Sequence, residues 1–338
     1  AGHITACRFE LFALQTALVE RAEAEVDTLL PAYTHVQRAQ PVRLAHWLLA
    51  HFWALDRDAR RLDQAAARAL ERLPLGSGAV TGNPFGIDRA ALAAELGFAG
   101  PSENSLDAVS DRDFAVEAVF AAALCGVHLS RFGEDLVLWS SAEFGFVRWP
   151  DRLATGSSLM PNKKNPDLAE LVRGRAAPLI GHLVALLTLL KGLPSGYQRD
   201  LQEDKPPVWD ALGILHVNLR ALTAAVQGIS FDRGRMAAAL TDDILATEMA
   251  DALVAHGVPF RTAHGLVSQA AAASRQSGRP LRVTLGEVLR GAAAELPGVD
   301  VAELIANLPG FEAAVERRSA VGGTARAAVF DQLARARG

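Results

Sequence analysis

The length of the uninterrupted helical runs is the feature that most constrains the fold. Residues 41–73 carry apolar side chains at helical spacing from Trp47 to Leu73, and neither glycine nor proline interrupts them after Pro41. At about 1.5 Å per residue, such a helix spans roughly 45 Å. Because a long helix is stabilised mainly by packing of its apolar face, the sequence predicts a long-helix bundle, larger than one chain completes.

Turn-forming residues separate this run from four other helical stretches. The predicted helices cover residues 4–30, 113–144, 167–192 and 207–228. Residues 74–112 and 145–166 are rich in Gly, Ser, Asn and Pro, which predicts loops of the kind that hold functional residues. No run alternates apolar and polar residues over a strand's length. Pro31 is expected to end one helix because proline breaks helices, and Pro41 is expected to begin the next because proline is tolerated at the first helical position. His35 is therefore placed in a connection between helices.

The composition supports an all-α class. Half of the residues are hydrophobic but only 6% are aromatic, and Ala and Leu outnumber the β-branched residues. The 338 residues exceed the ~250–300 at which single cores stop growing, which favours two domains. From about Phe231 onward the predicted helices become short and Ala-rich. We expect a central bundle domain over residues 1–235 and a small helical domain over residues 236–338.

Charge and cysteine content exclude several classes of protein. The 34 basic and 38 acidic residues give a net charge of -4, which disfavours nucleic acid or an acidic membrane surface as the partner. The most apolar window, Leu183–Leu190, is far shorter than the ~20 residues that span a bilayer, so we expect a buried helix there and no membrane segment. Cys7 and Cys125 are the only cysteines, which fits a reducing compartment, and we expect the cytoplasm. No cysteine or histidine cluster predicts a metal site.

The loop at residues 155–166, TGSSLMPNKKNP, has the most distinctive order of residues in the chain. Lys163 and Lys164 lie just before Asn165, which is suited to cap a helix that has Pro166 at its first position. A helix N-terminus beside two lysines predicts an anion site. The alternative is an ordinary solvated loop, because its residue types are common in such loops.

The order of residues in this loop resembles the signature loop of the fumarase/aspartase superfamily, G-S-S-x-M-P-x-K-x-N-P. Residues 156–166 fill all eight fixed positions of that pattern. Two other segments, YTHVQRAQP at 33–41 and GYQRDLQEDK at 196–205, resemble the argininosuccinate lyase family and its crystallin relatives. The turn-rich segment at 74–88 and GGTARAAV at 322–329 are also similar to that family. The resemblance covers essentially the whole chain.

The resemblance implies the elimination chemistry of these lyases. They break a C–N bond by removing a proton beside a carboxylate, so charge builds on that carboxylate and its stabilisation is the largest effect. Ser157 matches the family's general base, and a hydroxyl needs nearby cations and backbone donors for that role. Lys163 and Asn165 match the residues that hold the reacting carboxylate, and the helix that follows adds its dipole.

The resemblance also assigns a second catalytic group. His35 matches a histidine that assists proton delivery to the leaving nitrogen, and an imidazole transfers protons in either direction near neutral pH. Thr34 matches a substrate contact, and Glu170 matches the acid that pairs with the histidine. An ordinary helical ion pair of Glu170 with Arg173 or Arg175 is the alternative.

Three side chains match the family's contacts to the arginine portion and the carboxylates of argininosuccinate. They are Tyr197, Gln202 and Lys205, and a loop must present them because their spacing does not follow one helical face. A turn-anchoring Tyr and a solvated Lys are the alternatives. Pro206–Pro207 departs from the family's usual continuation at the start of the next helix. Arg112–Asp113 resembles a buried structural pair of the family.

The sequence therefore predicts an enzyme that cleaves argininosuccinate to arginine and fumarate without a cofactor or metal. In this family four subunits share one helical bundle, so we expect a homotetramer with composite active sites. The family's N-terminal helical domain and its Ser-Arg-Asn motif precede the position of Ala1, so we expect the central and C-terminal parts of such an enzyme. The alternatives are a non-catalytic, crystallin-like or degenerate structural paralogue and another fumarate-releasing lyase, such as adenylosuccinate lyase. The segment at 197–205 disfavours that second lyase.

Overall fold

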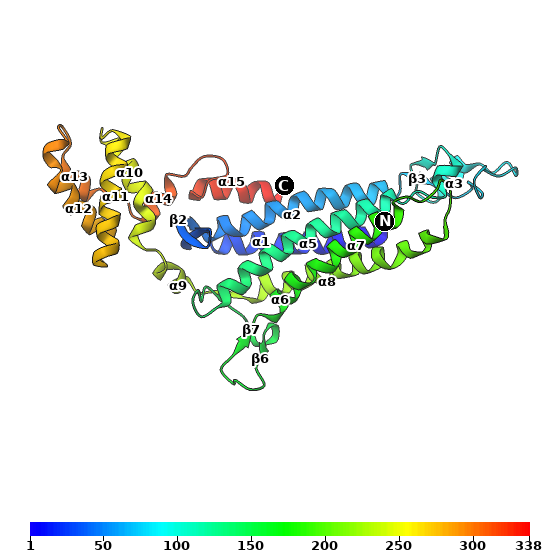
Figure 1. The fold of residues 1–338 in the computed structure, drawn as a ribbon, viewed down its shortest axis with the longest axis horizontal. Coiled ribbons are helices and arrows are strands. Elements are labelled where there is room, and N and C mark those ends of the chain that lie inside the picture. The colour runs from blue at the N-terminus through cyan, green and yellow to red at the C-terminus, as the bar shows by residue number, and fades with distance from the viewer. The chain divides into compact units, whose positions relative to one another are not determined.

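A computed structural model describes all 338 residues, and the chain is predominantly helical (Figure 1). The predicted all-α class is confirmed, since each sheet has only two strands. The helices are α1 (Gly2–Ala24), α2 (Leu44–Arg68), α3 (Arg89–Glu95), α4 (Ser105–Ala108), α5 (Asp113–Ser140), α6 (Asp167–Gly174), α7 (Ala176–Leu190), α8 (Lys205–Gly228), α9 (Arg233–Ala238), α10 (Ala246–Ala255), α11 (Phe260–Ser277), α12 (Leu281–Gly291), α13 (Val301–Ala306), α14 (Phe311–Glu316) and α15 (Arg326–Arg337). The strands are β1 (Leu29–Thr34), β2 (Gln37–Arg43), β3 (Arg72–Leu73), β4 (Gly100–Pro101), β5 (Val147–Arg148), β6 (Thr155–Gly156), β7 (Lys164–Asn165) and β8 (Ser230–Phe231).

The chain divides into two compact units. Unit 1 contains residues 1–18 and 50–230, and unit 2 contains residues 19–49 and 231–338. The border after Ser230 lies close to the one expected at residue 235, but residues 19–49 belong with the C-terminal part rather than with the bundle. Two ion pairs join residues 19–49 to the C-terminal part of unit 2. Arg233 binds Glu25 at 2.9 Å, and Arg337 binds Glu23 at 2.6 Å. Such pairing over a long sequence separation has no local sequence signal.

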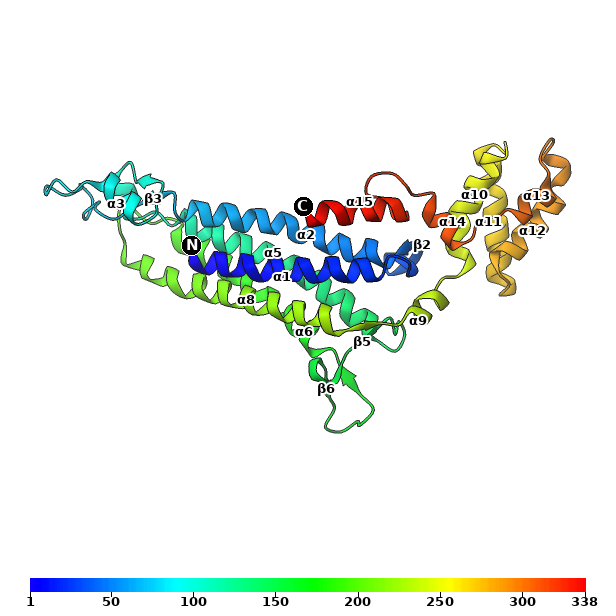
Figure 2. The same ribbon diagram turned by 180° about the vertical axis from the view of Figure 1, so that it is seen from behind.

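Unit 1 is a bundle in which α5 packs against α6, α7 and α8, and the long helices run side by side in both views (Figures 1 and 2). Small residues on α5 permit this packing. A Cβ added to Gly126 would collide with the Leu179 side chain, and one added to Gly133 would lie 2.9 Å from the Ala169 carbonyl oxygen. Glycine at these positions lets the α6 and α7 backbones approach α5 closely.

A buried polar contact joins α2 to α5. His128 Nδ1 lies 2.6 Å from the fully buried Asp58 carboxylate, which also accepts a hydrogen bond from Arg61 at 2.9 Å.

Burial raises the pKa of Cys7 to about 12 and holds that of Cys125 well above its ordinary value. Both thiols are free, and burial keeps them protonated near neutral pH.

The α6–α7 stretch is less buried than its sequence indicates. Two stretches, α5 and Asp167–Leu190, are long and apolar enough to cross a membrane by length and composition, and this is weak evidence for a span. Half of the apolar window of α5 is buried within the chain, against 22% for Asp167–Leu190. The prediction that Leu183–Leu190 is buried is therefore wrong for this chain: Leu186 is buried, whereas Val184 and Leu187 are about half exposed. One face of α7 packs on α5 and α8, and the other has no partner within this unit.

The first connection contains strands that the sequence did not predict. The helix expected over residues 4–30 ends at Ala24, and β1 pairs antiparallel with β2 so that Pro31 lies opposite Pro41. Pro41 therefore does not open a helix, and α2 begins at Leu44. Each strand of a two-stranded ribbon has a partner along one edge only. Proline is tolerated where the N–H group that it lacks would point away from the partner strand.

Other predicted boundaries differ by smaller amounts. The helix expected over residues 167–192 is divided at Arg175 into α6 and α7. The helix after Pro206–Pro207 forms, and the prolines occupy its first turn because α8 begins at Lys205. Missing N–H groups are harmless there, since first-turn amides have no partner within the helix.

Unit 2 has its own apolar core. Its buried residues come mainly from α10, α11 and α12, with Leu253, Leu285 and Leu304 fully buried. Arg43 at the end of β2 is also fully buried, and its guanidinium binds Glu312 and Glu316 of α14. A small C-terminal helical domain is therefore present.

Candidate active site

Two short strands close the loop at residues 155–166, called the signature loop below. β6 pairs antiparallel with β7, so that Thr155 lies opposite Asn165 and Gly156 lies opposite Lys164. The Thr155 hydroxyl also donates to the Asp167 carboxylate at the start of α6. The loop between the strands projects from the bundle in both views (Figures 1 and 2). The pairing of β6 with β7 fixes the two ends of this exposed loop.

Within this loop, Ser157 has a hydrogen-bonding environment that Ser158 lacks. The main-chain N–H groups of Leu159 and Met160 donate to Ser157 Oγ at 3.2 and 3.0 Å. Such donors stabilise a negative charge on the oxygen more than they stabilise the neutral hydroxyl. The turn therefore favours ionisation at Ser157. Sequence reasoning identified the serine but not these backbone donors, since they depend on the turn conformation.

The two lysines of the loop differ in pairing. Lys164 binds the Asp151 carboxylate, and this hydrogen bond holds the pKa of Asp151 below its usual range. Lys163 is exposed and makes no ion pair. An unpaired cation retains its full attraction for an added anion, so Lys163 is the better candidate to bind a substrate carboxylate.

Glu170 and Asn165 flank the start of α6. The expectation that Asn165 caps this helix is wrong, because α6 begins at Asp167 after Pro166 and has no side-chain cap. Asn165 is half-buried in β7, and Glu170 is exposed in the first turn of α6. Arg173, the alternative partner of Glu170, instead binds Glu134 of α5 at 2.6 Å. Glu170 therefore remains available to a group outside this part of the chain.

The Tyr197–Lys205 segment forms a second group of expected site residues. Gln202 Nε2 donates to the Tyr197 hydroxyl at 2.6 Å, and Lys205 Nζ donates to Asp204 at 2.6 Å. Gly196 begins the segment with φ of +86°, a conformation that favours glycine. The expected loop is mostly the short 3₁₀ helix η2 (Arg199–Asp204), which brings these side chains together.

The structure does not bring this segment near the signature loop. The signature loop precedes α6, whereas Tyr197 follows α7, and the intervening helical stretch has 24 residues. At 1.5 Å per residue that stretch is about 35 Å long. One small substrate cannot contact both segments of the same chain.

His35 and Thr34 lie in unit 2, at the tip of the β1–β2 hairpin. Thr34 pairs with Gln37, so His35 and Val36 form a two-residue turn in which φ is 53° and 58°. Positive φ at both central positions is the requirement of a type I′ turn, and it is unfavourable for a β-branched residue such as Val. The prediction that His35 lies in a connection is confirmed, although the connection is a hairpin.

The expectation of a buried Arg112–Asp113 pair is wrong, because Asp113 is exposed and Arg112 binds another carboxylate. Its guanidinium binds the buried Asp204 carboxylate instead, 92 residues further along the chain. Partial desolvation and the neighbouring carboxylates of Asp111, Glu117 and Asp107 raise the pKa of Asp113. Arg112 thus anchors the Tyr197–Lys205 segment.

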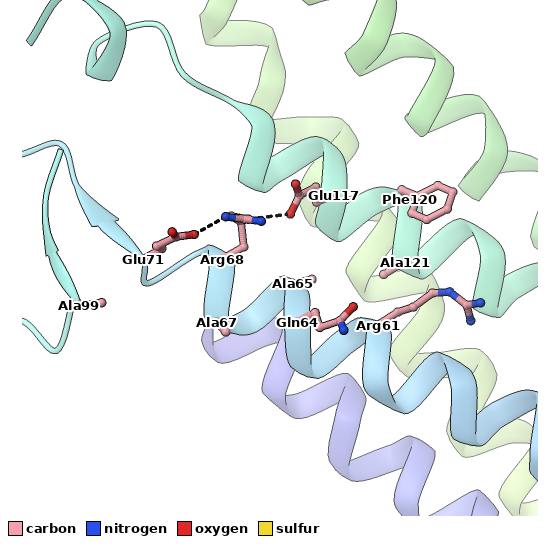
Figure 3. Close-up of a pocket in the computed structure, with 10 residues that line it drawn as sticks. All are labelled: Arg61, Gln64, Ala65, Ala67, Arg68, Glu71, Ala99, Glu117, Phe120 and Ala121. Carbon is pink, nitrogen blue, oxygen red and sulfur yellow. Dashed lines mark hydrogen bonds and ion pairs between the residues drawn. The ribbon is translucent and has the colours of Figure 1, made fainter. Parts of the chain in front are cut away.

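A groove between α2 and α5 is a separate concavity, of about 730 Å³ (Figure 3). Its central cation, Arg68, lies between Glu71 and Glu117, with the Glu117 contact at 3.3 Å. None of the expected site residues lines this groove, and the groove offers no unpaired arginine at its centre. The groove is therefore distinct from the site that the expected residues form.

Comparison with known proteins identifies the family. A lyase family matches residues 7–181, and the family described as argininosuccinate lyase C-terminal matches residues 243–310. The argininosuccinate lyase of Roseiflexus sp. (strain RS-1) is 53% identical over 97% of this chain and 70% of its own length. That of Herpetosiphon aurantiacus is 52% identical over 95% of this chain and 69% of its own length.

Solved structures agree with these relatives. An EDDS lyase variant with bound fumarate matches with a TM-score of 0.88 and 26% identity, covering 99% of this chain and 68% of that one. A 3-carboxy-cis,cis-muconate lactonizing enzyme from Pseudomonas putida, at 24% identity and a TM-score of 0.79, shows the same fold. The chain belongs to the argininosuccinate lyase family, within the fumarase/aspartase superfamily.

Proposed function

We propose that this chain cleaves argininosuccinate to arginine and fumarate with Ser157 as the base that removes the proton. The observation that carries the assignment is the pair of main-chain N–H groups that donate to Ser157 Oγ, at 3.2 and 3.0 Å. Lys163 on the same loop adds an unpaired positive charge. Together these groups favour the ionised oxygen, which takes the proton next to the substrate carboxylate.

The same loop stabilises the charge that develops on that carboxylate. Lys163 supplies the positive charge, and the Asn165 side chain supplies hydrogen-bond donors. The dipole of α6 contributes little, because Asp167 and Glu170 in its first turn oppose an added anion. Electrostatic stabilisation is thus assigned to side chains rather than to the helix end.

His35 completes the elimination by delivering a proton to the leaving nitrogen. In this proposal Glu170 pairs with the histidine and orients its imidazole, and Thr34 contacts the substrate beside it. The exposed position of Glu170 supports this role, as does the ion pair of Arg173 with Glu134 rather than with Glu170.

The active site is composite in this proposal, and the protein acts as a soluble homotetramer in the cytoplasm. The support is the separation of about 35 Å along α6 and α7 between the signature loop and Tyr197. The exposed apolar face of α7, with Ile180, Val184 and Leu187, fits against helices of other copies.

Fumarate release tests the function directly. Purified protein is incubated with argininosuccinate, adenylosuccinate, aspartate or malate, and fumarate is followed by its ultraviolet absorbance. We expect release from argininosuccinate alone. Release from adenylosuccinate would assign the chain to that substrate instead. Binding of argininosuccinate without release would favour the non-catalytic, crystallin-like alternative.

A further inference from the structure

We propose that Asp204 and Arg112 are positioning residues that hold the Lys205 ammonium ready for the substrate. This inference rests on the proposed role of Lys205 as a substrate contact. Lys205 Nζ donates to Asp204 Oδ1 at 2.6 Å and to the Leu201 carbonyl oxygen at 3.3 Å. The other oxygen of Asp204 accepts a hydrogen bond from Arg112 Nε.

Burial distinguishes the roles of these side chains. The Asp204 side chain is 9% exposed and that of Arg112 is 17% exposed, whereas that of Lys205 is 51% exposed. The carboxylate and the guanidinium are therefore fixed in the protein, and the ammonium is the member that faces solvent. A ligand from solution therefore meets the Lys205 ammonium more readily than the Asp204 carboxylate.

The charges explain why Arg112 is needed. A carboxylate paired with Lys205 alone would cancel the positive charge that attracts a substrate carboxylate. Arg112 compensates the buried Asp204, so the three side chains together keep one net positive charge at Lys205. Asp204 thereby orients the ammonium without neutralising the site.

Orientation matters because a lysine side chain is flexible. A free ammonium on a four-carbon stem loses rotamer freedom when it binds a ligand, and that loss weakens binding. The bonds to Asp204 and Leu201 restrict the stem beforehand. Removing the charge of Asp204 also leaves Arg112 and Lys205 as neighbouring cations, which drives the ammonium away from its position.

Substrate affinity tests the inference in a Ser157→Ala background, which is expected to bind argininosuccinate without converting it. Titration calorimetry compares Lys205→Ala, Asp204→Asn and the double variant. We expect Asp204→Asn to raise Kd about 3- to 10-fold, the range that corresponds to immobilising one flexible side chain. The double variant should bind no more weakly than Lys205→Ala, because Asp204 acts only through Lys205. Glu203→Gln, which removes an exposed neighbouring charge, is the control and should leave Kd unchanged.

The outcomes separate this inference from the proposed function. An unchanged Kd for Asp204→Asn beside a raised Kd for Lys205→Ala would overturn the positioning role only. Additive losses in the double variant would also overturn it, since Asp204 would then act through the fold. An unchanged Kd for Lys205→Ala would overturn the substrate contact itself. If Asp204→Asn fails to fold, Asp204→Glu keeps the charge beside Arg112, displaces the carboxylate by one methylene group, and should still raise Kd.

Discussion

The signature loop and the Tyr197–Lys205 segment hold their functional groups in different ways. In the loop, main-chain N–H groups bond to Ser157 Oγ, and the surrounding residues are largely exposed. In the segment, Gln202 bonds to Tyr197, and Lys205 bonds to the buried Asp204, which also binds Arg112. The proposed chemistry therefore sits on a loop with few packing contacts, whereas the proposed recognition sits on an anchored segment. Substitutions in the loop should change the rate, and those in the segment should change affinity.

The largest effect is expected at Ser157. Ser157→Ala should lower kcat by about 10⁴-fold with little loss of substrate affinity, because it removes the proton acceptor alone. Steady-state kinetics and calorimetry measure the two quantities. Ser158→Ala is the matched control and should lower kcat less than 10-fold, roughly one power of ten at most. Comparable losses at both serines would contradict the assignment of the base.

The two lysines of the loop provide the next comparison. Lys163→Ala should lower kcat/KM by about 10²- to 10³-fold, since it removes the cation facing the developing carboxylate charge. Lys164→Ala should have an effect below about 3-fold, because Lys164 is already paired with Asp151 at the exposed base of the loop. Initial-rate measurements give kcat/KM for both variants. Equal losses would show that the ion pair of Lys164 with Asp151 does not make the two lysines functionally different.

Gln202 tests the anchored segment. Gln202→Ala should raise KM about 10-fold and leave kcat nearly unchanged, because its contact is remote from the breaking bond. Tyr197→Phe removes the hydroxyl that accepts the Gln202 hydrogen bond and should raise KM by a smaller factor, about 2- to 4-fold. A fall in kcat with unchanged KM would place this segment in the chemical step.

The smallest effect is expected at the hairpin tip. Val36→Gly should increase the free energy of unfolding by about 1 kcal/mol, because glycine adopts the positive φ of 58° without strain. Chemical denaturation measures this change. Val36→Ala keeps the Cβ atom and should gain less. A destabilised glycine variant would mean that the exposed Val36 side chain makes a stabilising contact.

Local patterns predicted the long helices well because each apolar face repeats over many turns. They failed at β1 and β2, where Pro31 and Pro41 resemble helix boundaries although the two strands tolerate them. They also overestimated the burial of α7, since much of its apolar surface has no partner within this chain.

The identities of the expected site residues came from motifs, but their environments did not. The donors to Ser157 Oγ depend on a turn, and the partner of Arg112 lies 92 residues away in the sequence. Neither contact leaves a periodic signal that a single sequence displays. The motif therefore identified the candidate residues, and the structure shows how their environments differ. Lys164, for example, is paired with Asp151, whereas Lys163 makes no ion pair.

The separation of the signature loop from the Tyr197–Lys205 segment has a genetic consequence under the composite-site proposal. In a cell that carries two defective alleles, one altered at Ser157 and the other at Lys205, some sites of a mixed oligomer draw both intact segments from different subunits. Such a cell regains part of the activity that either allele alone has lost. Two alleles altered within the same segment leave every site damaged. The severity of a pair of alleles would thus follow from which end of the α6–α7 helical stretch each one affects.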